Sequence, residues 1–236
     1  MVKIMREQKS KSSLGNDFWY KTIPVLALGM GFWFVTSLTF SGLLGFTIIE
    51  FTLGITILLI VAYIFFWIIT IILAFYKKNI LSMIFFFAAS LITGVLGSSI
   101  LMWATSIVGE GIVLPLFFMA SFIGLLVTFA ILVLGLIFRD KIHENWIYPL
   151  LVFGLILVVL EFTLILIFGF NAVILVTSVL VLIWLFAIIL WDGSRLPEII
   201  DEGFWMLAVI NLFLDLINVI IRIFIILVKI IGDALE

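Results

Sequence analysis

The sequence of 236 residues contains no cysteine and a single histidine, His143. The absence of cysteine excludes disulfide bonds, thiol catalysis and cysteine-based metal sites, and one imidazole without His or Cys companions makes a poor metal site. The chain also lacks a G-x-x-x-x-G-K phosphate loop, a G-x-S-x-G nucleophile elbow and an H-E-x-x-H pair. We therefore expect a protein that is not an enzyme and that carries no resident cofactor.

Charged residues are scarce as well, at 11% of the chain, whereas hydrophobic residues make up 66%. Soluble domains carry about 25% charged residues, so this composition predicts an integral membrane protein whose main partner is the lipid bilayer. The net charge of -2 and the absence of a basic domain argue against a nucleic-acid partner.

Long uncharged runs predict seven membrane-spanning helices, because a helix needs about 20 apolar residues to cross a bilayer. Four spans are expected at residues 22–49, 51–76, 79–109 and 111–138, and a seventh at 204–231. The run 146–191 is too long for one span and should break at 169–171 into a fifth and a sixth. The predicted fold is an all-α integral membrane protein with a tail at 1–21 and one seven-span transmembrane domain at 22–236.

The basic residues predict the orientation of these spans. Five precede the first span, and the others outside the spans lie in alternate connections, which places the N-terminus in the cytoplasm. The tail lacks a cleavage pattern typical of a signal peptide, and without a retention signal it favours the cell (plasma) membrane. The residues concerned are Lys3, Arg6, Lys9, Lys11, Lys21, Lys77, Lys78, Arg139, Lys141 and Arg195.

The seventh predicted span carries a stripe of polar residues. Asn211, Asp215, Asn218, Arg222 and Lys229 lie within about 60° of one another on a helix that turns about 100° per residue. Because an ionised group at the bilayer centre costs at least about 3 kcal/mol, we expect Asp215 and Asn218 to face the bundle interior. The seventh helix should then be central, with six helices around it. Asn211 and Lys229 have a simpler interpretation, as contacts between helices and with the outer surface.

Glu161 is a second acidic residue inside a predicted span. It lies about 22 Å into the fifth span, between the depths of Asp215 and Arg222 in the seventh. It either neutralises Arg222 in a buried ion pair or supplies a second ligand along an ion pathway. The ion pair is favoured, because an unpaired arginine at that depth would be costly.

Two C-terminal motifs resemble the signatures of the Bax inhibitor-1 (transmembrane Bax inhibitor motif) family. The sixth span ends in A-I-I-L-W-D-G-S-R-L, and L-F-L-D-L-I-N follows in the seventh; the family has an aromatic-Asp-Thr-Gln-like sequence and an L-Y-L-D-x-I-N core at these places. The resemblance implies six helices around a central seventh and a calcium-permeable leak controlled by an aspartate pair. Asp192 and Asp215 match that pair, and Asn218 matches the family's asparagine.

The sequence departs from the family pattern in several places. Gly193 and Ser194 replace the Thr-Gln-like dipeptide, and Phe213 replaces the tyrosine. The second span has no basic residue to face the acidic pair, which puts a latch of that kind in doubt. Arg222 is the candidate substitute.

Asp192 has two interpretations. It could cap the inner end of the sixth span and pair with Arg195, which would contribute little at a wet surface. If instead the helix continues to Pro197, Asp192 lies more than one turn inside the helix and can approach Asp215.

These residues predict a passive ion pathway. Two carboxylates, with the carbonyl oxygens of Asn211 and Asn218, suit the transient binding of a hard cation such as Ca²⁺. Asp192 and Asp215 should share a proton in a low-dielectric cavity, because both cannot ionise easily. We therefore expect a pH-sensitive calcium (cation) leak channel, with calcium as the permeant ion. The alternatives are a proton-coupled transporter that uses Asp215 and Glu161 as carriers, and a non-conducting membrane regulatory protein.

Overall fold

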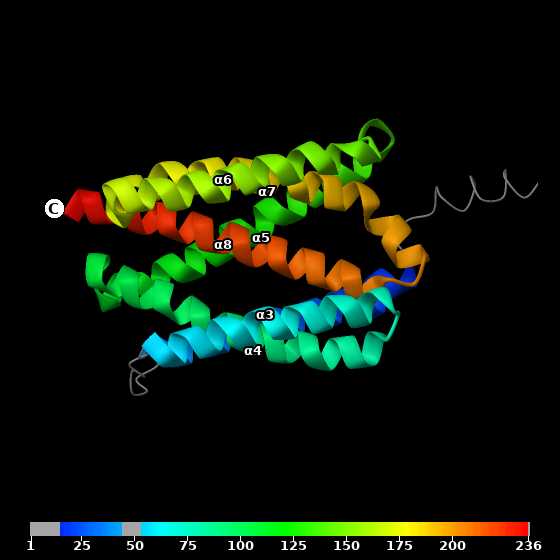
Figure 1. The fold of residues 1–236 in the computed structure, drawn as a ribbon, viewed down its shortest axis with the longest axis horizontal. Coiled ribbons are helices and arrows are strands. Elements are labelled where there is room, and N and C mark those ends of the chain that lie inside the picture. The colour runs from blue at the N-terminus through cyan, green and yellow to red at the C-terminus, as the bar shows by residue number, and fades with distance from the viewer. Residues whose placement is uncertain (1–14, 44–52, 236) are drawn as a thin grey trace, which may run out of the picture. The chain divides into compact units, whose positions relative to one another are not determined.

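The computed structural model describes residues 15–43 and 53–235, and in these ranges the chain forms long helices and no strands (Figure 1). A short π-helical segment, Phe18–Thr22, leads into the first helix, and the connection between α5 and α6 contains two short 3-10 turns, Arg139–Lys141 and Glu144–Trp146. The long helices are α2 (Ile23–Phe40), α3 (Leu53–Phe75), α4 (Asn79–Val108), α5 (Glu110–Ile137), α6 (Ile147–Phe168), α7 (Phe170–Asp201) and α8 (Trp205–Leu235).

These helices correspond to the seven apolar segments of the sequence. The break expected at 169–171 is confirmed, because α6 ends at Phe168 and Gly169 adopts a φ of 82°, a conformation that glycine reaches without steric cost. The first helix differs from the prediction at both ends. It ends at Phe40 rather than at residue 49, helical turns begin before Thr22, and residues 44–49 of that predicted span lie outside the described ranges.

Six of the helices in the described chain are long and apolar enough to cross a membrane, which makes the protein a multi-pass integral membrane protein. The six segments are Phe18–Phe40, Ile55–Phe75, Asn79–Val108, Glu110–Ile137, Glu144–Phe168 and Val173–Asp201. The α8 helix, which carries the polar stripe, is not among them.

The chain divides into two compact units. The first consists of residues 1–102 and 196–213, and the second of residues 103–195 and 214–236. In the first unit, Phe86 of α4 contacts the rings of Trp67 of α3 and Phe213 of α8, with centroids 6.1 and 5.0 Å away. Gly94 lies against Trp33 of α2 so closely that an added Cβ would stand 2.6 Å from the Trp33 carbonyl oxygen. Aromatic packing and close backbone contact therefore hold this unit together.

The second unit contains α5, α6, most of α7 and the C-terminal two thirds of α8. Gly154 of α6 lies directly against the indole of Trp184 on α7, and the Trp184 Nε1–H donates to the Leu150 carbonyl at 2.8 Å. A glycine on one helix thus makes room for a large aromatic ring on the next, and the ring satisfies its polar atom on the backbone.

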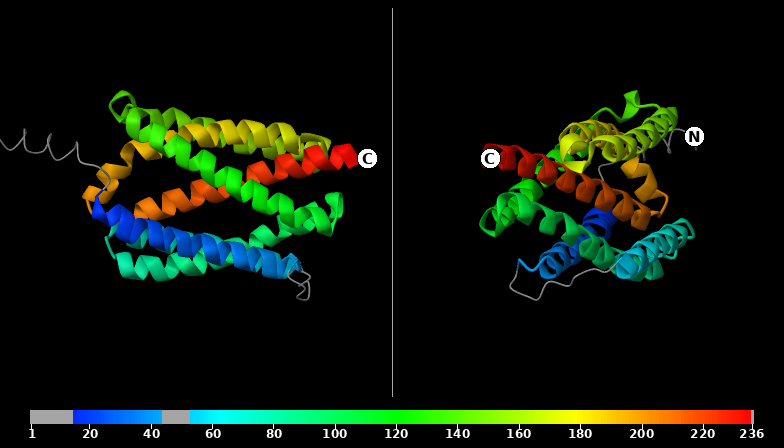
Figure 2. Two further views of the ribbon diagram at one scale, coloured as in Figure 1. Left: turned by 180° about the vertical axis from the view of Figure 1, so that it is seen from behind. Right: turned by 60° about the vertical axis from the view of Figure 1, so that its left-hand side comes forward.

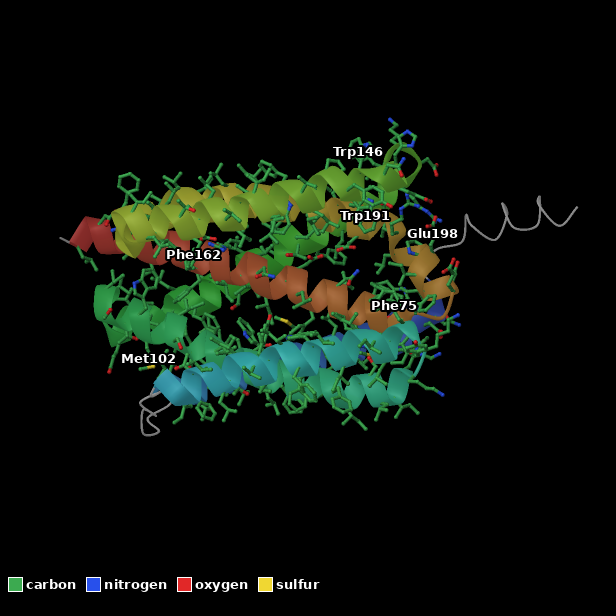
Figure 3. All side chains as sticks on the ribbon, viewed as in Figure 1. Phe75, Met102, Trp146, Phe162, Trp191 and Glu198 are labelled. Carbon is green, nitrogen blue, oxygen red and sulfur yellow. The ribbon has the colours of Figure 1, made fainter. Side chains whose placement is uncertain are left out.

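The surface of α6 is apolar and exposed. Gly154 and Leu157 are its buried residues, whereas Phe162 near its end is 65% exposed and Trp146, just before it, 50% (Figure 3). Such a surface would be unfavourable in water and suits contact with lipid hydrocarbon.

Candidate functional site

The carboxyl groups of Asp192 on α7 and Asp215 on α8 are joined by a hydrogen bond. Both residues are buried, with 8% and 6% of their surface exposed. Because an ionised carboxylate can only accept hydrogen bonds, a bond between two carboxyl groups requires a proton that they share. The two aspartates singled out by the C-terminal motifs therefore meet inside the second unit.

Asp192 reaches this position because α7 does not end beside it. The helix continues to Asp201 and includes Pro197, so Asp192 lies about two and a half turns inside the helix. The interpretation of Asp192 as the end of a span is wrong for this reason. Arg195, its expected surface partner, donates to Glu144 at 3.0 Å.

Close contact between α5 and α7 positions the Asp192 segment. Gly135 of α5 lies against the backbone of Leu190, Gly193 and Ser194, and a Cβ on Gly193 would stand 2.7 Å from the carbonyl oxygen of Leu132. No side chain separates the two helices at this point. The residues on either side of Asp192 are therefore fixed directly on the backbone of α5.

The α5 and α8 helices cross in the same unit (Figure 2). Gly124 lies against Ile220, where an added Cβ would stand 2.7 Å from the Ile220 Cγ1. The ring centroids of Phe117 and Phe224 are 5.5 Å apart. Phe117 comes before Gly124 on α5, whereas its partner Phe224 comes after Ile220 on α8. The two helices therefore run antiparallel at their contact.

A second polar contact joins α6 to α8. Arg222 donates to both carboxylate oxygens of Glu161, at 2.6 and 3.0 Å, and its Nη1 also lies 3.4 Å from the Ser178 hydroxyl. The Thr177 hydroxyl donates to the same carboxylate at 3.2 Å. The side chains of Glu161 and Arg222 are 15% and 20% exposed. This is the ion pair that the sequence favoured over a second cation ligand.

The pairing of Arg222 corrects one expectation. Arg222 was the candidate to replace the basic residue that the second span lacks, but both of its terminal nitrogens bind Glu161. The guanidinium is therefore committed to α6 and does not serve as the latch of the aspartate pair.

The other members of the polar stripe differ in environment. Asn218 is exposed and its amide donates to the Leu214 carbonyl at 2.8 Å, so the expectation that it faces the interior beside Asp215 is wrong. Asn211 is half-buried, one turn before Asp215. Lys229 forms an ion pair of 2.6 Å with Asp233 near the end of α8. The stripe therefore contains one buried acid, one residue in an interhelical ion pair and three groups that are less buried than Asp215.

Thr128 of α5 is a buried polar residue that the sequence analysis does not single out. It is 4% exposed, and its Oγ1 has no hydrogen-bond partner among the described residues. The Asp215 Oδ2 is also buried and has no hydrogen-bond partner among the described residues. A threonine in an apolar helix carries no pattern that distinguishes a binding role from a packing role, so only the structure identifies it.

The acidic pair does not form a metal centre on its own. Within residues 15–43 and 53–235, no three His, Cys, Asp or Glu residues are close enough together to hold a metal ion, and His143 is exposed in the α5–α6 connection. Ca²⁺ prefers six to eight oxygen ligands. Two aspartates supply part of such a set, which suits transient rather than permanent binding.

No known family model matches the chain. No curated protein matches it either. The resemblance to the Bax inhibitor-1 family therefore depends on the motifs around Asp192 and Asp215.

Proposed function

We propose that the protein is a pH-sensitive calcium (cation) leak channel of the Bax inhibitor-1 type, in which Asp192 and Asp215 control the pathway. The observation that supports this proposal is the buried hydrogen bond between the two carboxyl groups. A shared proton ties α7 to α8, and its loss changes both the attraction between the helices and the negative charge offered to a cation.

The charged groups nearest to the pair along α7 and α8 have partners of their own. Arg195, about one turn from Asp192, binds Glu144, and Arg222, two turns from Asp215, binds Glu161. Gain or loss of a proton therefore changes the charge of the pair and leaves these two ion pairs in place. This arrangement supports pH as the controlling variable.

In the proposed topology the protein lies in the plasma membrane, and its N-terminus is in the cytoplasm. This topology makes α8 a seventh span at the centre of six others. Its support is the burial of α8, in which apolar residues along the whole helix are enclosed, in contrast to α6. Examples from both ends are Met206, Val209, Val219, Phe224 and Val228.

The decisive experiment is calcium flux into liposomes that contain the purified protein and an internal calcium-sensitive dye. We expect downhill Ca²⁺ entry that needs no coupled gradient and that changes with pH. Obligatory exchange of protons for Ca²⁺ would instead indicate a proton-coupled transporter. Absence of any flux in vesicles shown to contain folded protein would leave the non-conducting regulatory function.

A further inference from the structure

Thr128 differs from most threonines in the described helices. A threonine inside a helix commonly satisfies its hydroxyl by donating to the carbonyl four residues earlier. The hydroxyls of Thr36, Thr39, Thr70, Thr93 and Thr163 do so, at distances of 2.6 to 2.8 Å. Thr128 is buried and its Oγ1 forms no hydrogen bond in the described part of the chain. Its hydroxyl is therefore available to something other than its own helix.

The position of Thr128 on α5 follows from its neighbours. It lies four residues after Gly124, which contacts Ile220 of α8, and seven before Gly135, which contacts Leu190 and Gly193 of α7. Spacings of four and seven place all three residues on one face of the helix. Thr128 thus faces the junction of α5, α7 and α8.

The antiparallel contact with α8 fixes the height of Thr128. Gly124 is level with Ile220, so a residue one turn further along α5 is level with a residue one turn earlier on α8. That turn contains Asp215 and Leu216. The unpartnered Oγ1 of Thr128 therefore lies within about one helical turn of the unpartnered Oδ2 of Asp215.

Two buried oxygen atoms without partners at one junction indicate a ligand. Buried polar atoms in folded proteins almost always have a partner, which is ordered water or an ion where protein atoms do not supply it. The atoms here are a hydroxyl and a carboxylate oxygen, and Asp192 adds its own carboxyl group. Neutral and anionic oxygens are the ligands of a hard cation.

We propose that the Thr128 hydroxyl is a third oxygen ligand, with the carboxylates of Asp192 and Asp215, in a site for a partly dehydrated hard cation such as Ca²⁺. The proposal rests on the proposed function in that it uses the same aspartate pair. It adds a residue that decides how tightly the cation is held.

The test measures cation binding directly. Purified full-length protein in detergent is titrated with CaCl₂ at constant ionic strength and pH, and the melting temperature is followed for the wild type, Thr128→Val, Thr128→Ser and Thr163→Val. Valine matches threonine in shape and removes the hydroxyl, whereas serine retains it. Thr163 is exposed on α6 and already bonded to its own helix, so its replacement is the matched control.

We expect Ca²⁺ to stabilise the wild type, Thr128→Ser and Thr163→Val alike. Thr128→Val should bind at least about tenfold more weakly, the scale on which loss of one supporting group weakens a metal site. Without Ca²⁺, Thr128→Val should melt no lower than the wild type, because it removes a hydroxyl without a protein partner. A lower melting temperature in the absence of Ca²⁺, an unchanged affinity, or a wild type that Ca²⁺ does not stabilise would each overturn the site.

The same variants separate this proposal from the proposed function. Binding that depends on Thr128, in a protein that shows no flux in liposomes, would retain the site and refute the channel. Flux that is equal in the wild type and Thr128→Val, with equal Ca²⁺ affinity, would retain the channel and refute the role of Thr128.

Discussion

Glu161 on α6 and Arg222 on α8 face each other through two parallel hydrogen bonds, of 2.6 and 3.0 Å. Fork-to-fork geometry of this kind is the strongest form that an arginine–carboxylate contact takes. Thr177 and Ser178, which are adjacent on α7, supply further hydrogen bonds. One ion pair thus connects three helices of the second unit.

The first prediction concerns the stability that depends on this pair. Glu161→Gln or Arg222→Met alone should lower the free energy of unfolding by about 3–5 kcal/mol, because either change leaves a largely buried charge without its partner. The double variant should lose much less. The measurement is unfolding in mixed detergent micelles. Losses that simply add in the double variant would show that the two residues do not interact.

The pair formed by Lys229 and Asp233 is the matched control. It has the same short distance of 2.6 Å, but the Asp233 side chain is 52% exposed. An exposed ion pair contributes about 0–1 kcal/mol, so Asp233→Asn should change stability little. A loss as large as that of Glu161→Gln would mean that burial is not the deciding factor.

The second prediction concerns the response to pH. As pH rises and the shared proton leaves, the charge of the pair of Asp192 and Asp215 changes from one negative charge to two. Asp215→Asn retains the shape and removes this change, so its Ca²⁺ flux should differ from wild type and be nearly independent of pH between about 5 and 8. Asp192→Asn should behave in the same way if the two residues act as one unit.

The measurement is dye-reported Ca²⁺ entry into proteoliposomes at several pH values, with Asp233→Asn as an acidic variant that lies outside the pair. Variants that retain the full pH response of the wild type would refute a gate at this pair. A wild-type flux that does not vary with pH would refute it as well.

The third prediction tests the close approach of α5 and α7. A Cβ on Gly135 would meet backbone atoms of Leu190, Gly193 and Ser194, which cannot rotate away as a side chain can. Gly135→Ala should therefore lower the free energy of unfolding by about 1–3 kcal/mol. In Gly31→Ala, no described atom outside the glycine's own helical neighbourhood lies within 4 Å of the new Cβ, so stability should be unchanged or rise by up to about 1 kcal/mol. Equal effects would show that the contact is not tight.

The fourth prediction uses the absence of cysteine to test topology. Single cysteines are introduced by Lys141→Cys in the α5–α6 connection and by Glu110→Cys at the first residue of α5, and both native residues are exposed. A membrane-impermeant thiol reagent should label the cysteine at 110 in intact cells. It should label the cysteine at 141 only after the cells are permeabilised. The opposite pattern would reverse the orientation, and labelling of both from one side would refute the number of spans between them.

The sequence predicted the helices well because their limits are set by strong local signals. Charged residues and glycines end the apolar runs, and Gly169 breaks a run that composition alone would leave continuous. The aspartate pair could also be predicted from the sequence, because each aspartate lies in a recognisable motif. The partner of Arg222 was found by an energetic argument, since few opposite charges lie at its depth.

The sequence could not resolve which side of the polar stripe is buried. Asp215 and Asn218 lie at opposite edges of an arc about 60° wide on the surface of α8. In the structure the edge with Asp215 is buried and the edge with Asn218 is exposed. A helical projection gives the angle between two residues but not the position of the neighbouring helices. Thr128 was missed for a related reason, because its significance comes from the contacts of Gly124 and Gly135 and not from its own segment.

The two polar contacts of α8 also determine its axial rotation. Asp215 and Arg222 are seven residues apart, about 10 Å along the helix, and they bind different helices, α7 and α6. Apolar side chains such as those of isoleucine and leucine can exchange neighbours at small energetic cost, so they define the angle of a helix loosely. A carboxyl group and a guanidinium with fixed partners allow one angle and one axial position. In a chain so rich in interchangeable apolar residues, a few polar atoms select a single arrangement of this helix from many of similar packing energy.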